Sequence, residues 1–74
     1  MQDYIINVND IEEWQTINNM IELERVFDRA KQAIVNGKSV LLTRRQHSGN
    51  IEKFDELRTL DELTDYKDRV YKYL

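Results

Sequence analysis

The chain has very few residues that force a turn, and this restricts its fold more than any other feature. Among 74 residues there is no proline, and the two glycines are Gly37 and Gly49. Glycine adopts positive φ freely and therefore marks tight turns and helix ends. Gly37 follows a helical pattern and Gly49 follows the segment RQHS. We therefore expect a helix end at the first glycine and a hairpin tip at the second.

An amphipathic helix is predicted over residues 20–36. Apolar residues recur there at spacings of three and four, which places them on one face of a helix. They are Leu23, Val26, Phe27, Ala30, Ala33 and Ile34. Asn19 is a suitable N-cap, and Glu22 completes a capping-box-like pair three residues later. Gly37 suits the left-handed position that follows a helix.

A second helix is predicted from Thr59 to the C-terminus. Thr59 is its expected N-cap, and Glu62 is the capping-box partner. The apolar stripe of this helix consists of Leu60, Leu63, Tyr66, Val70 and Leu74. Basic residues fall in its second half, where they complement the helix dipole.

The chain resembles itself when it is shifted along its own sequence. Residues 11–29 align with residues 51–69, Trp14 falls on Phe54, and the two expected N-caps coincide. The alignment of caps, aromatic residues and helix starts predicts a structural repeat. Trp14 and Phe54 are both expected in the core because large aromatic side chains contribute most to core burial.

The repeat decides how residues 11–17 are interpreted. Their counterpart, residues 51–57, follows a β-rich run and a Ser-Gly turn, and is therefore predicted to be the second strand of a hairpin. By analogy, residues 4–8 and 11–17 form a first hairpin that turns at Asn9 and Asp10, both turn-favouring residues.

The predicted fold is α+β, with the order ββαββα, in a single small domain that spans residues 1–74. It is a two-layer sandwich made of a repeated ββα unit, in which a four-stranded, mainly antiparallel sheet carries two helices on one face. However, Ile11, Trp14 and Ile17 do not alternate as a regular strand requires, so this segment contains a bulge or is partly helical. If it is helical, the fold is βαββα with three strands.

The composition argues against several classes of function. Fourteen acidic and eleven basic residues give a net charge of −3, whereas phosphate-binding domains are usually basic. One histidine and no cysteine exclude the usual zinc and transition-metal sites. The Gly-Lys-Ser at 37–39 lacks the upstream glycine and the strand-to-helix order of a phosphate-binding loop. We therefore expect no metal and no cofactor.

We also expect no enzymatic activity and no membrane contact. A hydrolase built on His47 and Ser48 would need an acid that orients the histidine, and neighbouring side chains in a turn usually diverge. No apolar run approaches the length of a membrane span, and no signal peptide is visible. The expected location is the cytoplasm.

The basic window that starts at Lys38 is the first candidate site. It contains Lys38, Arg44, Arg45 and His47, and no acid. The two neighbouring arginines point to opposite faces of a strand, so one of them is expected to form a cross-strand ion pair with an acid of residues 51–57. Alternatively, the hairpin tip is a projecting basic finger. It would contact a protein through Arg44, Arg45 and His47, or phosphates through Lys38 and the two arginines.

The tyrosines near the C-terminus are the second candidate surface. Tyr71 and Tyr73 lie off the apolar stripe of the second helix. Tyrosine supplies a large contact area at low entropic cost, which suits a contact with a partner or with a second copy of the chain.

These observations favour a small, non-enzymatic protein-interaction or regulatory domain that binds an unidentified protein or itself as a homodimer. The alternative is a nucleic-acid accessory module that contacts phosphates through the basic hairpin. Salt separates the two, because phosphate binding weakens steeply with added salt.

Overall fold

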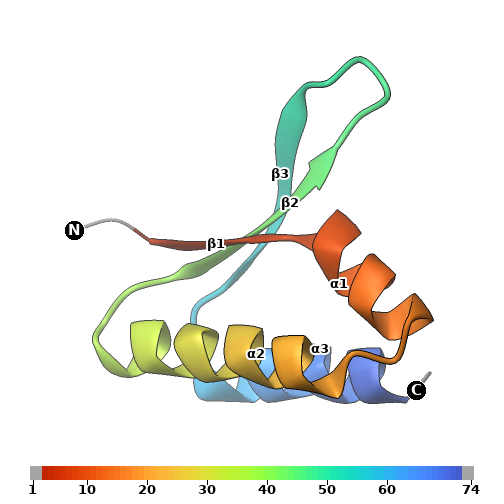
Figure 1. Ribbon diagram of the computed structural model, residues 1–74. Coiled ribbons are helices and arrows are strands. Elements are labelled where there is room, and N and C mark those ends of the chain that lie inside the picture. The colour runs from red at the N-terminus through yellow and green to blue at the C-terminus, as the bar shows by residue number, and fades with distance from the viewer. Residues whose placement is uncertain (1–2, 73–74) are drawn as a thin grey trace.

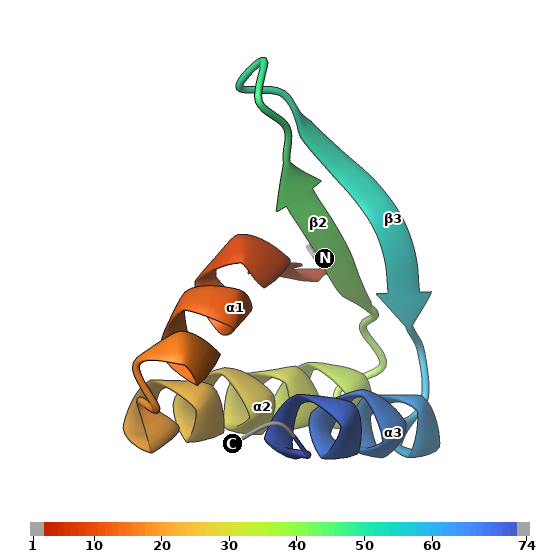
Figure 2. The same cartoon turned by 90° about the vertical axis from the view of Figure 1, so that its right-hand side faces the viewer.

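The computed structural model describes residues 3–72 and shows an α+β fold with three helices and a three-stranded mixed sheet (Figure 1). The helices α2 and α3 lie side by side and run in opposite directions (Figures 1 and 2). The hairpin of β2 and β3 projects away from this helix pair. The elements are β1 (Tyr4–Asn7), α1 (Val8–Thr16), α2 (Met20–Val35), β2 (Val40–Arg45), β3 (Ile51–Leu57) and α3 (Leu60–Tyr71).

The sheet has the strand order β1-β2-β3. The first strand pairs with β2 in parallel, with Tyr4 opposite Val40, and β2 pairs with β3 in antiparallel fashion, with Val40 opposite Leu57. A parallel pair needs a long crossover between its strands, and here α1 and α2 supply it.

The β2–β3 pairing contains a bulge. Leu42 lies opposite Asp55 and the next residue, Thr43, lies opposite Lys53, so Phe54 is an extra residue in β3. A bulge bends its strand and increases the local twist. Beyond this point the hairpin turns away from the rest of the molecule (Figure 2).

The core receives apolar side chains from every helix and strand, although β3 contributes Leu57 alone. A fully buried core residue in α2, Leu23, has no exposed surface, and Val40 in β2 also has none. The core consists of Ile6, Val8, Ile11, Leu23, Phe27, Ala30, Ala33, Val40, Leu42, Leu57, Leu63 and Val70.

The predicted first hairpin is wrong, because residues 8–16 form the helix α1. The N-cap of this helix is Asn7, whose side-chain oxygen accepts a hydrogen bond from the backbone N–H of Asn9 at 3.0 Å. Val8 and Ile11 are buried at a spacing of three residues, which is the helical period. The helical spacing of Val8 and Ile11 was therefore visible in the sequence, but the alignment with residues 51–57 led to the prediction of a strand.

The predicted four-stranded, mainly antiparallel sheet is wrong for the same reason. The ββα repeat is not confirmed, since residues 11–16 are helical whereas residues 51–57 are a strand. The three-stranded alternative has the right number of strands. However, it has one helix between the first two strands, whereas the structure has two helices, α1 and α2, between β1 and β2.

The predicted starts of α2 and α3 and the end of α2 are confirmed. The side-chain oxygen of Asn19 accepts from the N–H of Glu22 at 3.3 Å, and that of Thr59 accepts from the N–H of Glu62 at 3.1 Å. Gly37 follows α2 with a φ of 82°, in the left-handed region that glycine favours.

The turn between α1 and α2 uses asparagine where the end of α2 uses glycine. Asn18 has a φ of 56°, a conformation that asparagine tolerates better than most residues. Its N–H donates to the carbonyl of Gln15 at 3.2 Å, and the N–H of Asn19 donates to the carbonyl of Trp14 at 2.8 Å. These two bonds form a Schellman motif, which ends α1 without a glycine.

Candidate functional site

The β2–β3 hairpin divides at the bulge into two parts with different surroundings. We call residues 40–43 and 55–57 the base, and residues 44–54 the arm. In the base, Val40, Leu42 and Leu57 are buried. In the arm, every residue is exposed, and Figures 1 and 2 show it extending beyond the helices. The arm is therefore the most accessible part of the sheet.

The tip of the arm is a tight and well-defined turn. The N–H of Gln46 donates to the carbonyl of Asn50 at 2.7 Å, and the N–H of Gly49 donates to the carbonyl of Gln46 at 2.9 Å. Gly49 has a φ of 89°, as expected for the glycine of a three- to four-residue hairpin loop. His47 and Ser48 occupy the central positions of the turn. Within residues 3–72 no hydrogen bond joins either side chain to a carboxylate, so the contact that a hydrolase requires is missing there.

The helix α1 contacts the start of the arm at Arg44 and Arg45, which we call the root of the arm. The guanidinium of Arg44 donates to the carboxylate of Glu12 at 2.6 Å, and its carbon lies 6.0 Å from the ring centroid of Phe54. The backbone N–H of Arg45 donates to the side-chain oxygen of Asn9 at 2.8 Å. The expected cross-strand ion pair is therefore wrong. Arg44 instead pairs with Glu12 on α1, a segment that the sequence analysis assigned to a strand.

Two large apolar side chains of the arm are exposed. Ile51 exposes 60% of its surface and Phe54 exposes 56%. The prediction that Phe54 is a core residue is wrong, because the bulge and the projecting strand carry it away from the helices. Its counterpart, Trp14, is half-buried and packs against the core. A signal for the bulge was present in the sequence, because Ile51, Phe54 and Leu57 recur every third residue and cannot alternate across a regular strand.

The basic residues singled out from the sequence do not form one patch. Lys38 precedes β2, whereas the two arginines end it, so about 20 Å of extended chain separates them. The charge of Arg44 is already paired with Glu12. Among the described residues Arg45 takes part in no ion pair, and its exposed side chain is the free cation at the root of the arm.

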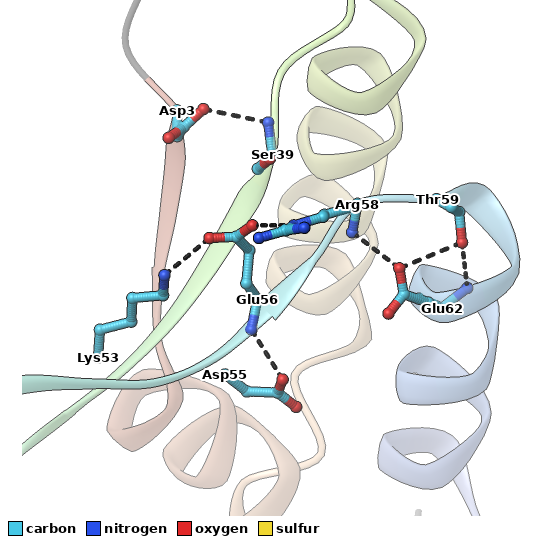
Figure 3. Close-up of polar contacts among 8 residues, drawn as sticks. All are labelled: Asp3, Ser39, Lys53, Asp55, Glu56, Arg58, Thr59 and Glu62. Carbon is cyan, nitrogen blue, oxygen red and sulfur yellow. Dashed lines mark hydrogen bonds and ion pairs between the residues drawn. The ribbon is translucent and has the colours of Figure 1, made fainter.

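The outer edge of β3 is charged. Glu56 binds both Lys53, at 2.7 Å, and Arg58 (Figure 3). The hydrogen bond from Lys53 and then that from Arg58 lower the pKa of the Glu56 carboxyl. The N–H of Glu56 also donates to the carboxylate of Asp55 at 2.8 Å. Charged side chains and a bulge both discourage the addition of another strand at this edge.

The tyrosines of α3 lie against α2. The rings of Tyr66 and Tyr71 pack on Phe27 at centroid distances of 5.8 and 5.7 Å. Burial and, secondly, the charge of Glu12 raise the pKa of Tyr66 to about 12. The hydroxyl of Tyr71 is buried and has no hydrogen-bond partner within residues 3–72. Tyr73, the other tyrosine predicted to contact a partner, lies outside the described residues.

No family model, curated protein or solved structure matches the chain. In the part of the chain that the structure describes, no helix has the length and apolar character needed to cross a membrane. In the same residues, no group of three or more histidine, cysteine, aspartate or glutamate side chains is placed to hold a metal ion. With Ile51 and Phe54 exposed on a projecting hairpin, the arm is the candidate site that the geometry supports best.

Proposed function

We propose that this protein is a small, non-enzymatic interaction domain whose arm contacts a protein partner. The observation that carries the proposal is the exposure of Ile51 and Phe54 on a hairpin that extends away from the core. A projecting element that exposes a large apolar side chain on each side is suited to contact a partner, because aromatic and other large apolar side chains form the centre of protein interfaces. Because the arm adds no side chain to the core, packing in the core does not restrict its residues, and they are available for a contact with a partner.

Each side of the arm combines an arginine with an apolar side chain. Arg45 lies directly opposite Ile51 in the β2–β3 pairing. Arg44, on the other side, lies over the ring of Phe54 and is held by Glu12. Arginine and aromatic residues are enriched among the side chains that dominate protein interfaces. The fixed position of Arg44 lowers the entropic cost of using it in a contact.

A protein partner fits the arm better than a nucleic acid does. The chain has a net charge of −3, and Glu52 lies opposite Arg44 within the arm itself. Lys38, the third cation of the nucleic-acid alternative, is remote from the arginines. Phosphate recognition relies on several free cations on one surface, and the arm presents few.

The proposal is tested by affinity capture from the lysate of the source organism, with and without nuclease. The arm variant is Ile51→Ser with Phe54→Ser. The matched control is Ile5→Ser with Val35→Ser, since these residues lie outside the arm and are exposed to a similar degree, 60% and 66%. We expect the same protein to be retained by the wild type and the control, and to be lost with the arm variant.

Two outcomes would contradict the proposal. Equal retention by the arm variant and the control would show that the arm makes no contact. Nucleic acid recovered by the wild type and lost with Arg44→Ala and Arg45→Ala, with steep weakening by salt, would support the nucleic-acid alternative. Urea unfolding of each variant shows whether a lost contact reflects a lost fold.

A further inference from the structure

A groove of about 760 Å³ runs between α2 and α3. Phe27 and Leu63 form its floor and are almost fully buried. Ile21 and Leu60 also line it, yet they expose 67% and 42% of their surfaces. A groove with a buried apolar floor and exposed aliphatic side chains on its rims is suited to receive another helix.

The rims of the groove carry charges that form no ion pair within residues 3–72, although Asp28 accepts a hydrogen bond from Gln32 at 3.4 Å and Lys67 lies 5.5 Å from the ring centroid of Tyr71. Glu24, Asp28 and Lys31 line it from α2, and Lys67 lines it from α3. None of the four forms an ion pair in the described chain, although Arg25, the remaining charge of the groove, is paired with Glu22 at 3.5 Å. The net charge of these two acids and two lysines is zero, so the groove does not select a strongly acidic or strongly basic partner.

The two ends of the groove have similar aliphatic and lysine side chains. Because α2 and α3 run in opposite directions (Figure 2), Leu60 lies toward the end that holds Lys31, and Lys67 lies toward the end that holds Ile21. Each end therefore has one exposed aliphatic side chain and one lysine. The acids lie between the ends.

We propose that this groove docks a second copy of the chain across a two-fold axis. In such a contact the two-fold axis is perpendicular to the groove, and α2 of each copy lies antiparallel in the groove of the other. Both copies then use the same surface, as in an isologous interface. Glu24 of one copy then faces Lys31 of the other, twice. Ile21 of one copy meets Leu60 of the other, also twice. The contact covers both exposed aliphatic residues and pairs Glu24 with Lys31, which form no ion pair within residues 3–72 of one copy.

The dimer leaves the arm free. The arm projects away from the helix pair (Figures 1 and 2), so two copies joined through α2 and α3 present two arms to solvent. Two linked contacts raise the apparent affinity for a partner with two binding sites. The dimer rests on the groove alone, however, and does not depend on the function proposed for the arm.

The test is sedimentation velocity over a series of protein concentrations, with four variants. They are Glu24→Lys, Lys31→Glu, the double swap of both residues, and Arg29→Glu as a control on an exposed charge of α2 outside the groove. Each single reversal places like charges opposite each other and is expected to weaken the dimer about tenfold. The double swap restores opposite charges across the axis and is expected to return the affinity to that of the wild type. The control is expected to leave it unchanged.

A wild type that stays monomeric at every concentration would overturn the proposal and leave the groove to another partner. The proposed contact would also be overturned if the single reversals left the dimer affinity unchanged, or if the double swap did not restore it. Circular dichroism and urea unfolding of each variant show that a monomer is folded. The same measurement on the arm variant separates the two proposals, since loss of the arm contact leaves the dimer intact.

Discussion

The base and the arm of one hairpin show how differently two halves of the same strands are used. In the base, Leu42 is 2% exposed and packs in the core. A few residues further along the partner strand, Phe54 exposes 56% of its surface. The bulge between the two parts bends the strand and separates them. The base therefore serves stability, whereas the arm is available for contacts that lie outside the fold.

The largest expected difference is between a truncation in the base and one in the arm. Leu42→Ala removes buried methyl groups and leaves a cavity, which costs about 2–5 kcal/mol. That is a large share of the stability of a small domain. Phe54→Ala is expected to change the free energy of unfolding by about 0.5 kcal/mol or less. Urea unfolding of both variants measures the difference, and equal losses would show that the arm is part of the stable core.

A substitution at the tip tests whether the arm unfolds by itself. Gly49 has a φ of 89°, and a Cβ there would meet no atom within 4 Å. Gly49→Ala therefore costs about 1–2 kcal/mol through backbone strain alone. We expect this cost to appear as faster amide exchange at Gln46 and Gly49, with core amides unaffected. Equal acceleration of the core amides would mean that the arm and base open together.

A titration tests the burial of Tyr66 between α3 and the rest of the core. The pKa of Tyr66 is raised from 10 to about 12, so the folded state favours the neutral phenol. The resulting stability is fully present below pH 10 and is lost as the pH rises from 10 to 12. At pH 11 the loss is about 1 kcal/mol. Urea unfolding at pH 9 and pH 11 should show this loss in the wild type beyond that in Tyr66→Phe, and an equal loss in both would contradict it.

The smallest expected effect concerns the tie between the arm and α1. Both side chains of the Arg44–Glu12 pair are about half exposed, so the pair contributes only about 0.2–1 kcal/mol. A double-mutant cycle with Arg44→Met and Glu12→Gln measures this coupling by urea unfolding. Added salt should reduce it. A coupling that persists at high salt would show that the root of the arm is more tightly integrated than its exposure indicates.

The helix starts were predictable because their signals are local. Asn19 and Thr59 cap α2 and α3 through hydrogen bonds to residues three positions later, and Gly37 ends α2. Such contacts form within one turn of the chain and need no information from elsewhere. The same holds for the tip at Gly49. The position of the basic hairpin was therefore correct, although the partners of its arginines were not.

Two segments with the same spacing of apolar residues show where prediction failed. Ile11 and Trp14, like Ile51 and Phe54, are three residues apart. The first pair belongs to α1, and the second belongs to a bulged strand. Three-residue spacing fits a helix or a strand with one extra residue, so the pattern alone does not decide. The alignment of the two segments assigned the same secondary structure, a strand, to both.

The sequence by itself determined the starts of α2 and α3, the end of α2, the turn at Gly49 and the α+β class, since caps, glycines and apolar periods act over a few residues. Only the tertiary structure decided that residues 8–16 are helical, that β1 pairs in parallel with β2, and that Arg44 binds Glu12. It also decided that Ile51 and Phe54 face solvent. Each of these depends on contacts between residues far apart in the chain, whose free energies exceed the local preferences of either segment.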